Sequence, residues 1–353
     1  MGDWITLSTR LVFWKWAAIG LLVAVFLTWA QARAVDGVAG MLQVGESSAL
    51  RPLIEDQLGE VPLAPGRGHD GQIFYSIGLD LDGNEVGPLL DHAAYRYRRV
   101  LLPLFASGFG LLDGWPLLWG QLIVCVLSMS MTTAIVGVMA HRARRSELLT
   151  LTVLLNPGMW LSVQLLTSDA LSIAAMLGAL LFVTTDRNRE STGLFSLSVL
   201  AKDVSLATPV PLGIDRRDWR MVLVPGAVLA VWMTWLTIQF GDGYASRGNL
   251  DWPFLGIVEA SSNWSTFEAK EWVFLVFALG SVIVGAWASL RASWLRWPIA
   301  AWTALAIVSS NWVWDFGNNA ARAFAPIVIL AALSFAYTGT RVDPTEKTPF
   351  AGT

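Results

Sequence analysis

Long apolar segments separated by short polar connections dominate the chain. A helix needs about 20 apolar residues to cross a bilayer, and several segments approach or exceed that length. The pattern predicts about eight full transmembrane helices, near 11–32, 115–140, 147–165, 168–185, 220–240, 271–290, 297–314 and 320–339. We therefore expect an all-α, polytopic helical membrane protein, with a single transmembrane domain over 1–340 and a cytoplasmic tail over 341–353.

The first apolar segment has two interpretations. Arg10 and Lys15 precede an apolar stretch that ends before Ala32-Arg33-Ala34, which is similar to a secretory signal with its cleavage site. The run over 11–32 is nevertheless long enough to span a bilayer. An uncleaved first helix is predicted, with a cleaved signal as the alternative.

The segment 192–213 differs from the others. Two apolar stretches flank Lys202 and Asp203, and Pro209 and Pro211 argue against one straight helix. Broken backbone is tolerated at membrane depth where protein or a water-filled cavity surrounds it. A re-entrant or broken helical hairpin is therefore predicted.

Positive charge gathers in alternate connections, and such charge favours the cytoplasmic side. Suppose that the N-terminus is cytoplasmic and that the 192–213 hairpin enters and leaves the membrane on the same side. All the basic residues of these connections are then cytoplasmic. They are Arg142, Arg144, Arg145, Arg187, Arg189, Arg216, Arg217, Arg220, Arg291, Arg296, Arg341 and Lys347.

The non-cytoplasmic face then collects the other polar groups. It holds a long first loop over 33–99 with interfacial helices, the turn at 167–169, the hairpin tip, the loop 241–270 and the turn 315–319. This convergence is the main functional signal in the sequence.

Composition supports the membrane class and excludes several others. The chain of 353 residues is 54% hydrophobic and 14% charged, whereas soluble domains are about a quarter charged. A net charge of -3 gives no indication of nucleic-acid binding. Cys125 is the single cysteine, so no intramolecular disulfide forms. The histidines and the cysteine lack zinc-site spacing.

Asp70 is the first candidate functional residue, because ionisable groups near hydrocarbon are costly and tend to be functional. Its carboxylate could act as a general base toward an acceptor hydroxyl, or it could cap a short interfacial helix. His69, Gln72 and Tyr75 accompany it within six residues. His69 by itself is also typical of a structural histidine.

The segment Tyr95-Arg96-Tyr97-Arg98-Arg99 is the second candidate. Three arginines lie where the charge rule disfavours them, just before the apolar run 100–104. Guanidinium groups suit phosphate recognition. Interfacial snorkelling is the alternative, and the tyrosines fit both interpretations.

Further charged residues occur in the turns of the same face. Asp169 follows Thr167-Ser168, which is typical of a helix cap. Lys202 and Asp203 could pair with each other or contact substrate, and Arg322 could pair with Asp315 across a turn.

The run Asp80-Leu81-Asp82-Gly83-Asn84-Glu85 hints at a calcium loop. It lacks the spacing of the twelve-residue EF-hand pattern. A solvated turn is predicted there rather than a calcium loop.

At Gly68-His69-Asp70-Gly71-Gln72 and Tyr95-Arg96-Tyr97-Arg98-Arg99-Val100-Leu101-Leu102-Pro103, the chain resembles bacterial membrane proteins of the GT-C glycosyltransferase superfamily, and more closely its mannosyltransferase-like members. Shorter motifs follow in the expected order at 156–158, 167–171, 200–203 and 322–326. Asp203 departs from the pattern, since members often carry Glu there.

The resemblance implies a polyprenyl-phosphate-linked sugar as donor and inverting transfer to a hydroxyl acceptor on the non-cytoplasmic face of a bacterial plasma membrane. It makes Asp70 the base candidate. The other substrate-binding candidates are His69, Gln72, Tyr75, Tyr95, Arg96, Arg98, Arg99, Asp169, Lys202, Asp203 and Arg322. The resemblance implies no particular cofactor. The need for a divalent cation, the identity of the sugar and the nature of the acceptor (a glycan, a lipid or a protein) stay open.

Two other functions compete with this interpretation. A lipid or solute transporter predicts polar groups through the bilayer midplane and two related halves, and the sequence shows neither. A non-catalytic partner of the same fold in envelope assembly is the second alternative.

Overall fold

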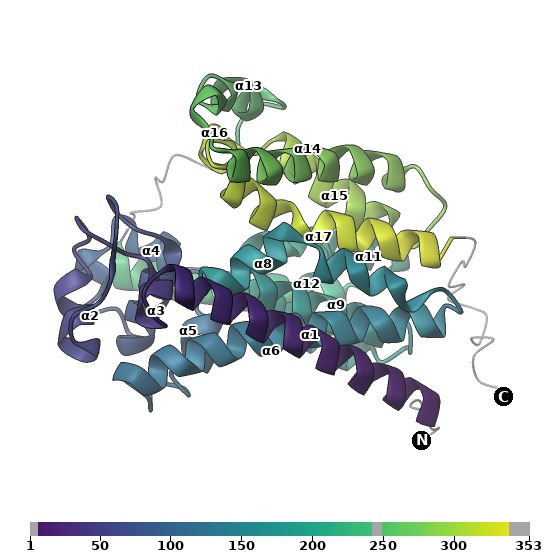
Figure 1. Ribbon diagram of the computed structural model, residues 1–353. Coiled ribbons are helices and arrows are strands. Elements are labelled where there is room, and N and C mark those ends of the chain that lie inside the picture. The colour runs from purple at the N-terminus through teal and green to yellow at the C-terminus, as the bar shows by residue number, and fades with distance from the viewer. Residues whose placement is uncertain (1–5, 242–248, 339–353) are drawn as a thin grey trace.

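Five long apolar helices carry the architecture (Figure 1). The computed structural model describes residues 6–241 and 249–338 and is helical almost throughout, with 17 α-helices in that part. Those long and apolar enough to cross a membrane are α1 (Leu7–Ala34), α6 (Gly114–Arg142), α12 (Arg220–Phe240), α14 (Ala269–Ser289) and α17 (Gly317–Ala336). The class expected from the sequence, an all-α multi-pass membrane protein, agrees with this arrangement.

The five helices differ in burial. In their most apolar windows, α6 is 78% and α17 72% buried, whereas α1, α12 and α14 are 17–28% buried. α1 packs along α6 and α14 packs along α17. Helices α6 and α17 therefore form the protein interior. Helices α1, α12 and α14 present most of their apolar side chains outward, as lipid-facing helices do.

Small residues bring α1 and α6 close together. A Cβ added at Gly20 would lie 2.8 Å from Thr133 Oγ1, and one at Gly137 would lie 2.6 Å from the Trp16 ring. The Ser130 hydroxyl donates a hydrogen bond to the Ala17 carbonyl at 2.8 Å. Close backbone approach and interhelical hydrogen bonds are typical of helix packing in membranes.

Three of the eight expected spans are shorter than predicted. The segment 147–165 divides into a 3₁₀ turn η3 (Glu147–Thr150), α7 (Leu151–Leu154) and α8 (Pro157–Gln164), and 297–314 divides into α15 (Arg296–Ile307) and α16 (Asn311–Trp314). The third, α9 (Asp169–Val183), has 15 residues.

The division at 156 has a local cause. The Asn156 side chain accepts hydrogen bonds from the N–H groups of Gly158 and Met159, so it caps α8. Pro157 has no N–H to continue the preceding helix and suits the first helical position.

The segment around 192–213 consists of α10 (Asn188–Ala201), a 3₁₀ turn η4 (Asp203–Ala207) and α11 (Pro209–Arg216). The break occurs at Lys202, whose backbone is extended. Pro209 starts α11, where its fixed φ is favourable. Both α10 and α11 pack against α12.

The first loop folds into short elements at one end of the long helices (Figure 1). Two parallel strands, β1 (Val44–Gly45) and β2 (Leu63–Ala64), pair in the register Val44–Leu63 and Gly45–Ala64. The other elements of this loop are η1 (Ala39–Leu42), α2 (Arg51–Leu58), α3 (Asp70–Leu79), η2 (Gly87–Leu89), α4 (Ala93–Tyr97) and α5 (Leu101–Ala106).

A second, smaller group of elements packs near the start of α14. It comprises α13 (Leu255–Ser261), η5 (Trp264–Thr266) and α16, and α13 contacts α16. Figure 1 places the start of α1 and the end of α17 at the end of the molecule away from α2, α3 and α4. We refer to the end with α3 and α4 as the site end, and to the other as the opposite end.

Candidate functional site

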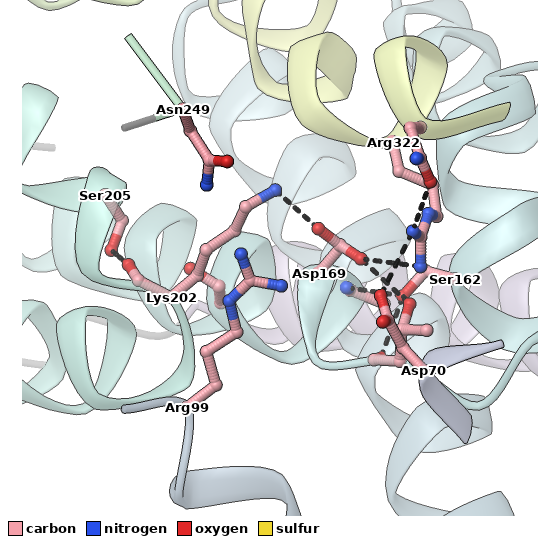
Figure 2. Close-up of polar contacts among 12 residues, drawn as sticks. Asp70, Arg99, Ser162, Asp169, Lys202, Ser205, Asn249 and Arg322 are labelled. Carbon is pink, nitrogen blue, oxygen red and sulfur yellow. Dashed lines mark hydrogen bonds and ion pairs between the residues drawn. The ribbon is translucent and has the colours of Figure 1, made fainter. Parts of the chain in front are cut away.

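Charged residues from five separate segments meet at the site end (Figure 2). Asp70 begins α3, Asp169 begins α9, Lys202 ends α10 and Arg322 lies in the second turn of α17. The arginines of the 95–99 segment complete the cluster. In Figure 2, Lys202, Arg99 and Arg322 point toward the two carboxylates of Asp70 and Asp169. The fold therefore gathers the residues that the sequence had placed on one face.

Asp70 is held by two arginines. Arg96 Nη1 donates to its Oδ1 at 3.1 Å, and Arg322 Nη2 donates to its Oδ2 at 3.3 Å. Burial raises the pKa of Asp70, but Arg322, Arg96 and Arg99 outweigh it, and the pKa is lowered. The carboxylate is thus ionised and already paired.

The capping interpretation of Asp70 is wrong. The cap residue of α3 is His69, and no side chain makes a capping hydrogen bond there. Asp70 is the first helical residue, where a negative charge favours the helix dipole. Gly68 places this turn close to the first strand, since its φ is +73° and an added Cβ would lie 2.1 Å from the Gln43 carbonyl oxygen.

Asp169 receives three contacts. Lys202 Nζ donates to its Oδ1, Thr167 Oγ1 donates to its Oδ2 at 2.8 Å, and Arg322 Nη1 lies 3.8 Å from Oδ2. Its side chain makes no capping hydrogen bond. Arg322 therefore lies between the two carboxylates, which belong to helices 99 positions apart in sequence.

The two charged residues at the hairpin tip, Lys202 and Asp203, form ion pairs with two different segments. Lys202 and Asp203 do not pair with each other, because Lys202 pairs with Asp169 and Asp203 pairs with Arg98 at 3.1 Å. Arg322 likewise does not pair with Asp315, whose carboxylate accepts from Asn263 at 3.1 Å. These ion pairs join the tip to the first loop and to α9.

Tyr95 organises the arginine segment. The guanidinium carbons of Arg96, Arg98 and Arg99 lie 5.5, 4.7 and 5.5 Å from its ring centroid. Arg99 Nη2 donates to the Tyr95 hydroxyl at 3.2 Å, and Asn249 Nδ2 donates to it at 2.9 Å. Arg99 is the main cause of a lowered pKa of Tyr95, which burial opposes.

Arg99 stands out among the cationic side chains of the cluster. Within the described residues, Arg99 makes no ion pair with a carboxylate, and its Nε is shielded without a hydrogen-bond partner. Five cations face four carboxylates: Arg96, Arg98, Arg99, Lys202 and Arg322 against Asp70, Asp91, Asp169 and Asp203. The surplus positive charge therefore resides on Arg99.

His69 adds no charge to this balance. Burial lowers the pKa of His69 below its ordinary value, Arg322 lowers it further, and Asp70 only partly opposes both. The ring is neutral at pH 7, and the cluster carries one net positive charge. A single anionic group is the matching ligand.

A small cavity opens beside Asp70. Its lining consists of Asp70, Ile73, Phe74, Tyr95, Arg96 and Arg99. The space for water within it is about 10 Å³, which suits about one water molecule. A sugar does not fit into this space.

Two candidates lie outside the cluster. Gln72 accepts a hydrogen bond from the Gly45 N–H at 3.3 Å and donates to the Arg67 carbonyl at 2.6 Å, so it fixes the first loop. Tyr75 is fully buried and donates to the Gly114 carbonyl at 3.1 Å. Gln72 thus ties α3 to the rest of the first loop, and Tyr75 ties it to the start of α6.

Two residues of the cluster were missed in the sequence. Asp91 accepts from Arg96 Nε and Nη2, both at 2.9 Å, although a spacing of five residues is not the i+3 or i+4 spacing of helical ion pairs. Asn249 reaches Tyr95 across 154 residues. No local pattern marks that contact.

The residues present do not fit a divalent cation. No group of three His, Cys, Asp or Glu side chains with metal-site geometry occurs within the described residues. The nearest carboxylates, Asp70 and Asp169, share the Arg322 guanidinium instead. The Asp80 carboxylate accepts the N–H groups of Gly83, Glu85 and Val86, so the run 80–85 is a hydrogen-bonded turn.

No protein-family model, curated protein or solved structure matches this chain. The functional argument therefore depends on the site itself.

Proposed function

We propose that the protein is a membrane glycosyltransferase of the GT-C type, which moves a mannose-like sugar from a polyprenyl-phosphate carrier to a hydroxyl acceptor on the non-cytoplasmic face of a bacterial plasma membrane. About eight membrane passages and a re-entrant hairpin at 192–213 belong to this proposal. The observation that carries it is the surplus cation Arg99, which lies beside the carboxylate of Asp70 in a cluster with one net positive charge.

The charge of the donor supports the assignment. A sugar linked to a lipid by one phosphate is a phosphodiester with a single negative charge, which matches the single surplus cation. After transfer, the leaving lipid phosphate is a monoester with about -1.5 to -2 charges. Fixed cations stabilise such developing charge more strongly than they stabilise the donor. Arg99 and, once released from Asp70, Arg96 are the groups placed for it.

Asp70 is the base in this mechanism. The acceptor oxygen attacks the anomeric carbon, the bond from that carbon to the phosphate oxygen breaks, and the hydroxyl proton passes to Asp70. Because Arg322 and Arg96 lower the pKa of Asp70, its carboxylate is a weak base. The proton therefore moves late, when the new bond has made the acceptor oxygen acidic.

Substrate entry requires the cavity to enlarge. Arg96 bridges Asp70 and Asp91, and a donor phosphate competes with both carboxylates for it. Transfer of Arg96 from Asp70 to the phosphate exposes one carboxylate oxygen and widens the space beside it. Donor binding and base activation are thereby linked.

A non-catalytic partner in envelope assembly is the second candidate function. It is favoured by the ion pairs that already engage Asp70, Asp169 and Asp203 and by the small size of the cavity. In that case the network joins the hairpin tip to the first loop and has no substrate. A transporter is less favoured, because Arg322 lies in the second turn of α17 and Asp70 lies in the first loop, rather than midway along the long helices.

A turnover assay separates the two. Purified protein in detergent is incubated with a panel of radiolabelled polyprenyl-phosphate hexoses and pentoses together with glycan, lipid and peptide acceptors. The enzyme interpretation expects labelled product and free polyprenyl phosphate, both lost in Asp70→Asn. Absence of turnover, together with unchanged donor affinity in Arg99→Ala, would support the assembly partner.

A further inference from the structure

A second group of arginines and aromatic rings lies at the opposite end of the helices. The guanidinium carbon of Arg216, at the end of α11, is 5.4 Å from the ring centroid of Trp294. Arg291 lies between the rings of Trp287 and Phe335, at 4.1 and 4.4 Å from their centroids. Both Arg291 and Trp294 belong to the short connection between α14 and α15.

Three donors in this group lack acceptors. Arg216 Nη2, Arg291 Nε and Trp294 Nε1 are shielded from solvent, and none has a hydrogen-bond partner among the described residues. Trp294 as a whole is only 8% exposed. A buried donor without an acceptor costs about 1–3 kcal/mol, and such groups are rare in folded proteins. Arg216 contacts Trp294, and Arg291 lies three residues before Trp294 in the same connection, so the three donors belong to one small region of the surface. A ligand that accepts hydrogen bonds would satisfy them.

Nearby carboxylates do not meet this need. Asp186, Asp215 and Asp218 influence Arg216 electrostatically, but none forms an ion pair with it within the described residues. Burial outweighs all three and lowers the pKa of Arg216. The cation is therefore incompletely compensated.

We propose that Arg216, Arg291 and the Trp294 indole bind a phosphate group, that of an anionic phospholipid headgroup at the bilayer surface. Phosphate oxygens accept from guanidinium and indole N–H groups, and charge-assisted bonds of this kind are strong. Basic pockets between transmembrane helices bind such headgroups. Leu290 and Trp297, next to the site, are 86% and 47% exposed and offer apolar surface to the acyl chains. This site is independent of the proposed function.

Lipid titration of the full-length protein in dodecyl maltoside tests the proposal. Native mass spectrometry measures binding of dioleoylphosphatidylglycerol against dioleoylphosphatidylcholine, and thermal unfolding measures the effect of inorganic phosphate. Arg216→Ala should weaken phosphatidylglycerol binding roughly ten-fold or more, and Trp294→Phe, which keeps the ring and removes the N–H, about three-fold to ten-fold. The exposed Arg145→Ala is the matched control and should bind like the wild type.

The outcomes are distinct. A raised unfolding temperature with inorganic phosphate alone, lost in Trp294→Phe, supports the phosphate site and identifies free phosphate as sufficient. Equal affinity for the two lipids would overturn the proposal. Undiminished phosphatidylglycerol binding in both Arg216→Ala and Trp294→Phe would overturn it as well, because binding would then reflect the general positive charge of this end.

Discussion

Arg322 Nη2 lies 3.3 Å from Asp70 Oδ2, across 252 residues of sequence. The same guanidinium lies 3.8 Å from Asp169, so one side chain of α17 ties the first loop to the start of α9. This contact fixes the position of Asp70, lowers its pKa and makes the arrangement of the candidate site depend on the packing of the whole molecule.

Replacing Asp70 with Asn tests the base. Asn keeps the size of the side chain but does not take up a proton at neutral pH. With a proven substrate pair, we expect turnover to fall on the order of 10²-fold or more, while donor affinity is largely kept. His69→Ala is the control and should lose less. Near-wild-type turnover in Asp70→Asn would remove Asp70 as the base.

Replacing Arg99 with Ala tests donor recognition. We expect donor affinity to fall by about 1–3 kcal/mol, as for the loss of a charge-assisted hydrogen bond. The unfolding temperature should change less than in Arg322→Ala, because Arg322 pairs directly with Asp70, whereas Arg99 forms no ion pair with a carboxylate in the described part of the chain. Arg67→Ala, an exposed arginine of the same loop, is the control. Equal donor binding by the two variants would assign Arg99 to snorkelling.

The Lys202–Asp169 pair is expected to hold the hairpin tip. Both side chains are more than 90% buried, and breaking a buried pair from one side costs about 3–5 kcal/mol. Lys202→Met should therefore lower the free energy of unfolding strongly. The double variant Lys202→Met/Asp169→Asn should regain part of the loss. Additive effects in this cycle, measured by denaturant unfolding, would contradict the pairing.

Acid should weaken the first loop through Asp70. Its pKa is lower in the folded protein than in the unfolded chain, where it is about 3.9, so its ionised form contributes stability above that pH. The contribution is lost as the pH falls through the folded pKa. We expect the unfolding temperature to drop less between pH 6 and pH 3 in Asp70→Asn than in the wild type. Identical drops would show that Asp70 is not linked to folding.

Cysteine labelling tests the proposed topology. In a Cys125→Ser background, cysteines are placed at the exposed positions Asp82 and Ser146. Asp82 follows α3 and Ser146 follows α6. A membrane-impermeant maleimide applied to intact cells should label the cysteine at Asp82 and spare the one at Ser146. Labelling of Ser146→Cys from outside would reverse the orientation and place the candidate site in the cytoplasm.

The sequence by itself determined the class of the protein and the residues that could form a site. Long apolar runs define helices such as α1, α6 and α17. The bilayer core offers backbone N–H and C=O groups no hydrogen-bond partners, so these groups must pair within a helix. Charged residues within or beside those runs, among them Asp70 in the first loop, Lys202 and Arg322, are recognisable because charge near hydrocarbon is costly.

Only the tertiary structure decided how these residues pair. Local patterns left open whether Lys202 pairs with Asp203 and Arg322 with Asp315, whereas the folded chain pairs Lys202 with Asp169 and Arg322 with Asp70. Ion pairs depend on distances that helix packing sets, and sequence spacing does not report these distances. For the same reason the sequence did not predict the contact of Asn249 with Tyr95. Arg99 could be identified as the surplus cation only once the ion-pair partners of the other four cations were known.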